Sequence, residues 1–356
     1  MESGDDNEEV IVMSGADDLR AAPYPMPPTT EVEVPVPLGP DFRSAIDAAN
    51  ARVDALGLAE LHTKNGTIRY LDVGEGAPVL LVHGMFGGSD AALRQLGPLV
   101  PAGFRIIAPS RFGYLGATLP VDATPARQAE LFIDLLDSLR IARVAVLAVS
   151  AGSTAALRLA TRHRRRVSAL ALVSPNAPGS HQDEKSMPGA VARMLLGSER
   201  LMWLLRRHYP ARLARLMGIA RYRALGGPDL ARVDAELDGL FPVARRVNGV
   251  LFDAFRSNPA VNDCEPRRVI APTLVVHARD DAVAPCRAAV GLSQRILGSR
   301  LLVEEHGGHL LLGQHPEVTA AVHALLLSTR DRPATSTPHR RVPRQVKRIC
   351  PPAARS

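Results

Sequence analysis

Short apolar segments alternate with helical patterns along most of this 356-residue chain. Continuous apolar runs are typical of strands buried on both faces, and one further segment, TIRYLDV (67–73), alternates like an antiparallel edge strand. This alternation predicts an α/β fold, with a doubly wound and mostly parallel sheet covered by helices on both faces. The continuous runs are PVLLVHG (78–84), FRIIAPS (104–110), VAVLAVS (144–150), ALALVSP (169–175), TLVVHA (273–278) and RLLVEE (300–305).

Residues 177–267 interrupt this alternation, because they contain no convincing buried strand. Leucine, methionine and the single tryptophan, Trp203, form stripes there with arginines between them. We expect a helical cap packed over one end of the sheet, inserted into a core formed by residues 41–176 and 268–329. A basic amphipathic surface that meets lipid is the alternative interpretation.

Both ends of the chain differ in composition from the middle. Residues 1–40 are acidic and rich in proline, whereas residues 330–356 are basic, and the whole chain carries a net charge of +7. Such segments bury too little apolar surface to offset the entropy of ordering, so we expect two disordered tails. The basic tail is a candidate contact for an anionic surface, but no aromatic residues are interleaved for base stacking, so no specific nucleic-acid partner is expected.

The sequence also indicates the compartment. No run of about 20 apolar residues suggests a membrane span, and the acidic start MESGDDNEEV does not resemble a signal peptide. The three cysteines, Cys264, Cys286 and Cys350, lie far apart and lack metal-ligand spacing. We therefore expect a cytoplasmic protein without a disulfide framework.

Ser150 stands where an apolar run ends and a helical pattern begins. Ala148, Ala151 and Gly152 surround it, which gives the pattern G-x-S-x-G with alanine in place of the first glycine. In a parallel sheet, ligands bind at the carboxyl ends of the strands, so a serine on such a turn is pushed into that crevice. The amides at the start of the following helix favour negative charge there.

Residues that could activate this serine follow two other predicted strands. RDDAVAP (279–285) supplies carboxylates, and HGGHLLLGQHPEV (306–318) places His309 on a glycine-rich turn. A serine hydroxyl needs a base to take its proton, and that base needs an acid to hold its tautomer. The order Ser, Asp, His along the chain is the order found in α/β-hydrolases.

Together, VHGMFGG (82–88), AVSAGS (148–153), RDDAVAP and GGHLLLGQHPEV resemble the α/β-hydrolase superfamily over about residues 60–329. The resemblance implies that Ser150 is the nucleophile, His309 the general base and then acid, and Asp281 the orienting acid. The family places this acid four residues before a proline, which favours Asp281 over the alternative, Asp280. It also implies an oxyanion hole made by two backbone amides, those of Met85 and Ala151.

The resemblance has consequences for neighbouring residues too. His83 is expected to buttress the oxyanion loop, and His277, inside a strand, to be a satisfied core histidine. The loop after residue 110 departs from the family pattern, because Ser110 replaces an acid and Gly113-Tyr114-Leu115 breaks a glycine pair. The possible substrate-pocket residues are Phe86, Arg111 and Tyr114, with a scaffold role as the alternative for the last two.

A serine at position 150 argues against the dehalogenase and epoxide hydrolase branches, which need an aspartate there. We predict a serine hydrolase that cleaves an ester or related acyl bond of a small, fairly apolar substrate through an acyl-enzyme. Two alternatives stay open, namely a serine-dependent carbon–carbon bond hydrolase and a ligand-binding protein with little turnover. No cofactor is expected, and no metal, because His306 and His309 lack a third ligand.

Overall fold

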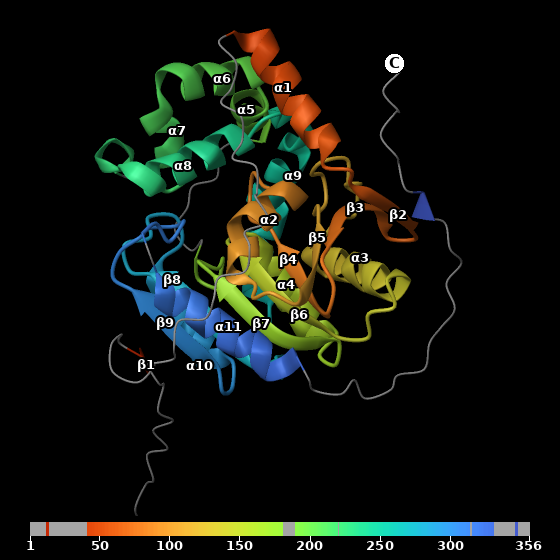
Figure 1. Cartoon of the computed structure of the whole chain (residues 1–356). Helices are drawn as coiled ribbons and strands as arrows, with labels where there is room; N and C mark the ends of the chain where they lie inside the picture. The colour runs from red at the N-terminus through yellow and green to blue at the C-terminus, as the bar shows by residue number, and fades with distance from the viewer. Residues whose placement is uncertain are drawn as a thin grey trace, which may run out of the picture.

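The computed structural model describes residues 41–180, 189–219, 221–313 and 315–330, together with two strands of two residues each. These short strands, β1 (Val12–Met13) and β10 (Val346–Lys347), lie at the edges of a sheet with the order β1-β9-β8-β7-β6-β4-β5-β3-β2-β10 (Figure 1). The eight strands between them are β2 (Ala59–Thr63), β3 (Gly66–Val73), β4 (Ala77–Val82), β5 (Phe104–Pro109), β6 (Val144–Val149), β7 (Val167–Val173), β8 (Thr273–Ala278) and β9 (Arg300–Glu304).

Strand direction confirms the predicted α/β class and the mostly parallel sheet. Strands β5, β4, β6, β7, β8 and β9 pair in parallel, whereas β2 and β3 join the edge by antiparallel pairing. The carboxyl ends of β4, β6, β8 and β9 therefore meet at one edge of the sheet. The segments that carry Met85, Ser150, Asp281 and His309 follow these four strands, and the segment with Arg111 and Tyr114 follows β5.

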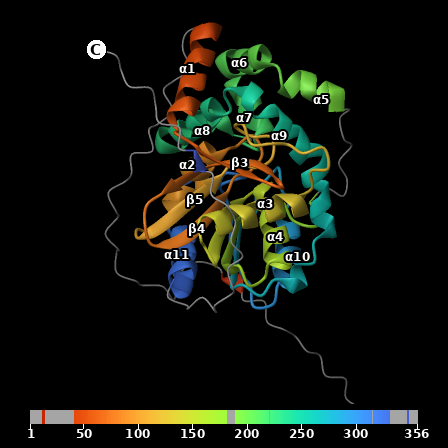
Figure 2. The same ribbon diagram turned by 90° about the vertical axis from the view of Figure 1, so that its right-hand side faces the viewer.

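Helices cover both faces of the sheet (Figure 2). Alternate residues of β4 show why, because Val79 and Leu81 pack into one apolar cluster while Leu80 and Val82 pack into another. The first cluster contains residues of α2 (Ser89–Leu96) and α11 (Pro316–Arg330). The second contains residues of α3 (Pro125–Ser138), α4 (Gly152–Arg162) and α10 (Cys286–Arg295).

Helix α3 begins where its capping residues predict. The Thr124 hydroxyl accepts a hydrogen bond from the Arg127 amide at 3.1 Å, and Pro125 occupies the first turn. A proline there loses no helical hydrogen bond, because the first amides of a helix have no partner within it.

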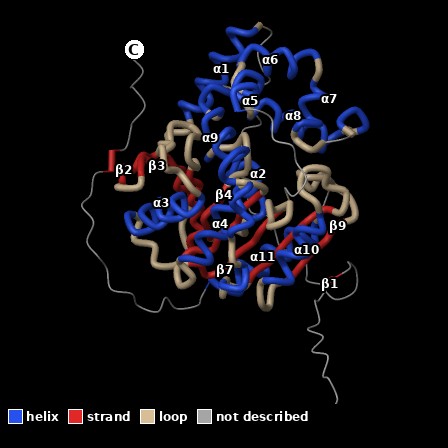
Figure 3. Tube along the Cα trace, turned by 180° about the vertical axis from the view of Figure 1, so that it is seen from behind, coloured by secondary structure: helices blue, strands red, loops and turns tan. Residues whose placement is uncertain are grey.

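Between β7 and β8 the described residues form helices and turns without a strand (Figure 3). We call residues 189–267 the cap segment. Helix α1 (Phe42–Ala55) packs on it although it lies far away in sequence: the Phe42 and Trp203 rings meet edge to face at 5.8 Å, and Arg52 donates to the Phe241 carbonyl at 2.8 Å. The helices of the segment are α5 (Gly189–Leu196), α6 (Glu199–His208), α7 (Pro210–Leu216), α8 (Gly227–Gly239) and α9 (Val247–Phe252).

Shorter helical turns complete the described chain. They are η1 (Gly97–Leu99), η2 (Tyr222–Ala224), η3 (Val243–Arg245), the π-helical turn η4 (Asp253–Ser257), η5 (Pro259–Asp263) and η6 (Pro266–Arg268). Among the described helices, none combines the length and hydropathy that crossing a bilayer requires. Apart from β1, β10 and Arg330, the two predicted tails lie outside the described residues.

Candidate active site

Ser150 occupies a sharp turn between β6 and α4. Its φ of +51° lies in the left-handed region, where a non-glycine residue is strained. A Cβ on Gly152 would lie 2.5 Å from the carbonyl oxygens of Val82 and His83, so only glycine allows the turn to pack this closely on the end of β4. The same packing brings Gly84 against the Ser150 side chain, since a Cβ there would lie 3.1 Å from Ser150 Cβ.

The structure brings the three predicted triad residues into direct contact. His309 Nε2 lies 2.8 Å from Ser150 Oγ, and His309 Nδ1 lies 2.8 Å from Asp281 Oδ2. Each residue follows a different strand, β6 for the serine, β8 for the aspartate and β9 for the histidine. The three loops therefore build one hydrogen-bonded chain at the carboxyl edge of the sheet.

The Asp281 carboxylate is surrounded by donors. Its Oδ1 accepts from the amides of Val283 at 2.8 Å and Ala284 at 3.0 Å, while Oδ2 faces His309 and, at 3.2 Å, His277 Nε2. Burial alone raises the pKa of Asp281, but hydrogen bonds from His277 and His309 outweigh it and hold this pKa well below its usual range. The carboxylate is therefore ionised and accepts from His309 Nδ1–H.

Asp280 has a different position, as a loop residue. Its Oδ1 accepts from the Gly308 amide at 2.8 Å, which ties the loop after β8 to the glycine turn before His309. This contact corresponds to the loop or capping role expected for Asp280, and it leaves Asp281 as the carboxylate beside the imidazole.

The contact of His277 with the site was not predicted from the sequence. Its Nε2 lies 2.8 Å from the Ala284 carbonyl and 3.2 Å from Asp281 Oδ2, both acceptors, so this nitrogen carries the proton. His277 is fully buried, as expected, but its Nδ1 has no partner among the described residues, so the expectation of a fully satisfied core histidine is wrong for this nitrogen. The sequence feature that could have indicated this contact is the position of His277 at the end of a strand, four residues before Asp281.

Met85 and Ala151, the predicted oxyanion-hole residues, flank the serine on two sides. Ala151 follows Ser150 directly, and Met85 follows Gly84, which packs against the Ser150 side chain. Within the described part of the chain, neither backbone amide has a hydrogen-bond acceptor. Two unpaired amides beside a serine hydroxyl are what an oxyanion hole requires.

His83 and Arg111 hold the loop that carries Met85. His83 Nε2 accepts from the Arg111 amide at 3.0 Å, and Nδ1 donates to the Gly84 carbonyl at 2.8 Å. Burial lowers the pKa of His83 well below its usual value, and the Arg111 guanidinium adds to this, so the ring is neutral. Arg111 also donates to the carbonyls of His83 at 2.8 Å and Gly84 at 3.0 Å. His83 thus has the contacts of a buttress.

Arg111 and Tyr114 lie in the interior, with 1% and 0% of their surfaces exposed. Both contact Asp253, which the sequence pattern did not single out: the Tyr114 hydroxyl donates to its Oδ2 at 2.6 Å, and Arg111 forms a bidentate pair with it. Burial raises the pKa of Tyr114 well above its usual value, and the Asp253 charge adds to this. Because other side chains enclose them, Arg111 and Tyr114 have the scaffold positions given as the alternative, rather than positions on an open substrate surface.

The cap segment covers the site with apolar residues. Phe86 is 8% exposed and belongs to an apolar cluster with Ile219 and Phe241. Gly218 has a φ of +82°, and a Cβ there would lie 3.0 Å from His309 Cβ. The cap segment therefore packs directly on the candidate base. In the described residues, no group of three His, Cys, Asp or Glu side chains is arranged to hold a metal ion.

The sheet order, the serine turn after β6 and the Ser–His–Asp contacts define an α/β enzyme of the hydrolase class. A family model described as the alpha/beta hydrolase fold matches residues 77–316, and the chain belongs to this family. The chain is 30% identical over 274 residues to a 2-hydroxymuconate semialdehyde hydrolase from Pseudomonas putida, covering 73% of this chain and 90% of that relative. The chain is accordingly a hydrolase.

Solved structures agree with this fold. An alpha/beta hydrolase fold protein from Nakamurella multipartita superimposes with a TM-score of 0.59 at 28% identity, over 76% of this chain and 98% of that one. An esterase from Exiguobacterium antarcticum gives a TM-score of 0.57 at 21% identity, over 74% and 97% of the two chains. The second likeness bears on the fold alone.

Proposed function

We propose that this hydrolase cleaves the ester bond of a small, fairly apolar acid through a covalent acyl-enzyme on Ser150. The observation that carries the proposal is the continuous hydrogen-bonded chain from Ser150 through His309 to Asp281. Because the ionised carboxylate accepts from Nδ1–H, the Nε2 of the neutral imidazole is the nitrogen that takes the serine proton.

The reaction follows from this arrangement. Ser150 Oγ attacks the ester carbonyl while His309 takes its proton, and the amides of Met85 and Ala151 stabilise the oxyanion that forms. His309 then protonates the leaving alcohol as the tetrahedral intermediate collapses to the acyl-enzyme. A water molecule, deprotonated by His309, attacks the acyl carbon and releases the acid, which restores Ser150.

The surroundings of the serine favour an uncharged, apolar acyl group. Met85, Met217 and Leu310 pack against the apolar cluster that contains Phe86. Two buried guanidinium groups lie near the oxyanion loop, and both have a carboxylate partner: Arg111 pairs with Asp253, and Arg246 pairs with Asp90 at 2.7 Å. Neither of these two groups beside the oxyanion loop is left as a spare cation for a negatively charged substrate; Arg232, which has no carboxylate partner among the described residues, lines a neighbouring cavity that Ser150 does not line.

Carbon–carbon bond hydrolysis is the second candidate function. The relatives named as hydrolases of 2-hydroxymuconate semialdehyde and of 2-hydroxy-6-oxononadienedioate are each 30% identical to this chain. Their substrates, as named, carry an enol and a carbonyl. Hydrolysis of the carbon–carbon bond next to that carbonyl combines acyl transfer to the serine with protonation of a carbon leaving group. The same serine, histidine and oxyanion amides serve either bond.

Labelling with a fluorophosphonate probe tests the proposal, with wild type compared with Ser150→Ala and His309→Ala. We expect labelling of wild type alone, followed by hydrolysis of p-nitrophenyl esters from acetate to octanoate. Turnover of 2-hydroxymuconate semialdehyde with no ester hydrolysis would favour the second candidate. Folded wild type that neither labels nor turns over substrate would contradict both and favour the ligand-binding alternative.

We further propose that the protein acts in the cytoplasm. The support is that, within the part of the chain that the structure describes, Cys264 and Cys286 form no disulfide, as suits a reducing compartment. Fractionation of cells that express the full chain, with antibody detection, tests this. The contact of the basic tail with an anionic surface stays a prediction.

A further inference from the structure

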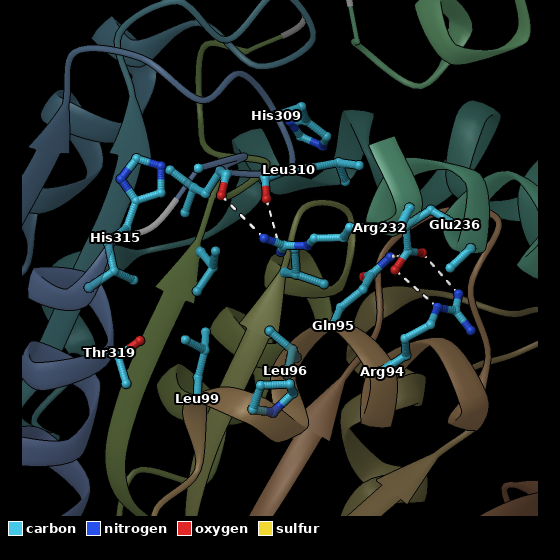
Figure 4. A pocket seen from close by; sticks show the side chains of 18 residues that line it. Arg94, Gln95, Leu96, Leu99, Arg232, Glu236, His309, Leu310, His315 and Thr319 are labelled. Carbon is cyan, nitrogen blue, oxygen red and sulfur yellow. Dashed lines mark hydrogen bonds and ion pairs between the residues drawn. The ribbon is translucent and has the colours of Figure 1, made fainter. Parts of the chain in front are cut away.

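A cavity of about 460 Å³ lies beside the candidate active site (Figure 4). Helix α8 of the cap segment, helices α2 and α11 of the core and the loop after His309 enclose it. His309 lines it, whereas Ser150 does not. Its volume falls within the range of small-molecule sites, and its apolar wall includes Leu96, Leu99, Val149, Val173, Leu311 and Val318.

Most charges around this cavity are already paired. Arg94 donates to both carboxylate oxygens of Glu236, at 3.0 and 2.9 Å, and Gln95 adds a third hydrogen bond at 2.7 Å. His315 Nε2 lies 2.8 Å from the Leu312 carbonyl, and its Nδ1 lies 3.4 Å from Glu304. These groups need no further partner.

Arg232 of α8 is different, because it is an exposed cation at the mouth of the cavity without a carboxylate. Its guanidinium donates to the carbonyls of Leu310 at 3.1 Å and Leu311 at 3.3 Å, and no acid pairs with it among the described residues. Figure 4 shows the guanidinium between the loop after His309 and the Arg94–Glu236 pair. The planar fork of an arginine matches a carboxylate better than it matches two separate carbonyls.

We propose that this cavity is a binding site for a monocarboxylate with an unbranched apolar chain. The carboxylate pairs with Arg232, and the chain lies along the apolar wall formed by Leu96, Leu99 and Val318. Binding itself does not depend on the proposed ester hydrolysis. If that proposal holds, the ligand belongs to the same chemical class as the acid product.

The site is coupled to the catalytic loop through α8. Arg232 holds the carbonyls of the two residues that follow His309, and Asp229 Oδ1 accepts from the Gly313 amide at 3.0 Å. A carboxylate that engages Arg232 withdraws donors from Leu310 and Leu311, and so loosens the loop that positions His309. Occupancy therefore lowers kcat and leaves the KM for an ester nearly unchanged.

Calorimetric titration with octanoate tests the site without requiring turnover. We expect one equivalent to bind the wild-type protein, and Arg232→Gln to weaken binding at least about tenfold. Arg207→Gln, which removes an exposed arginine of α6 with the same charge change, retains wild-type affinity. Arg232→Lys keeps the charge and part of the affinity, which separates loss of the cation from misfolding. Octanol, which has the chain without the charge, binds much more weakly.

Three results would overturn the proposal: no octanoate binding to wild type at millimolar ligand, equal binding to Arg232→Gln, or equal binding of octanol. Where ester turnover is measurable, octanoate that competes with the ester would place the ligand in the acyl site and also overturn it. A protein without ester turnover still gives a decisive titration, so failure of the proposed function and failure of this site are distinguishable.

Discussion

Arg111 and Asp253 form a bidentate ion pair in the interior of the protein, with Nη1–Oδ1 at 2.7 Å and Nη2–Oδ2 at 2.6 Å. Arg111 follows β5, whereas Asp253 lies 142 residues later, directly after α9 in the cap segment. The same guanidinium donates to the carbonyls of His83 and Gly84, directly before the proposed oxyanion amide of Met85. One buried pair thus joins the cap segment to the loop that faces the candidate nucleophile.

Breaking this pair should destabilise the whole fold. Asp253→Asn leaves the Arg111 charge buried without a counterion, and we expect a loss of about 3–5 kcal/mol in the free energy of unfolding. Urea denaturation of the purified variant measures this. The control is Arg105→Gln, which removes the partly exposed pair with Asp72, and its expected loss is below about 1 kcal/mol. Equal losses in the two variants would contradict a special role for the buried pair.

Turnover should depend on Asp281 and not on Asp280. Asp281→Asn removes the charge that holds the His309 tautomer, so we expect kcat to fall by about 10³–10⁴. Asp280→Asn retains most activity, because this side chain contacts the Gly308 amide and not the imidazole. Steady-state kinetics on both folded variants decides the assignment, and the reverse pattern would make Asp280 the acid.

Glycine at position 152 should be indispensable for the serine turn. A Cβ at this position would collide with two backbone carbonyls, so Gly152→Ala displaces the turn, and we expect loss of fluorophosphonate labelling. At Gly291 in α10, a Cβ would meet no atom within 4 Å, so Gly291→Ala keeps labelling and stabilises the helix by about 0.5–1 kcal/mol. Labelling that survives in Gly152→Ala would show that the turn adapts.

Stability should fall in acid partly through Asp90. Burial alone raises the pKa of Asp90, but the Arg246 charge and hydrogen bonds hold it well below its usual range. A carboxyl whose pKa is lower in the folded than in the unfolded chain stabilises the fold above its unfolded pKa of about 3.9. That contribution is lost as the pH falls through this value toward the folded pKa.

Asp90→Asn should therefore reduce the acid dependence of stability as well as stability at neutral pH. The measurement is the free energy of unfolding in urea between about pH 6 and about pH 3, the window in which the unfolded carboxyl begins to bind protons. Glu317→Gln at the exposed start of α11 serves as the control and should keep the wild-type slope. An unchanged slope in Asp90→Asn would show that other carboxyls account for the acid dependence.

Local patterns in the chain were enough to predict the seven strands β3 to β9, the helix that begins after Thr124 and the serine at the end of β6, whereas β2 and the two-residue strands β1 and β10 were not predicted. These features depend on side-chain periodicity and turn chemistry within a few residues, so the sequence of each segment is sufficient to indicate them. The same patterns placed His309 and the carboxylates of RDDAVAP after two other strands, at the edge where parallel strands bring their carboxyl ends together. The choice of Asp281 over Asp280 came from the resemblance to the α/β-hydrolase superfamily.

The partners of Arg111, His277 and Arg232 could not be predicted in this way. Each of these side chains has polar atoms that can meet several kinds of partner, and no local pattern indicates whether a carboxylate, a carbonyl or water will be the one. Packing decided that Arg111 meets Asp253 across 142 residues and that Arg232 meets the carbonyls after His309. A buried polar group must take the partners that the tertiary structure brings within hydrogen-bond distance, and only the folded chain determines which those are.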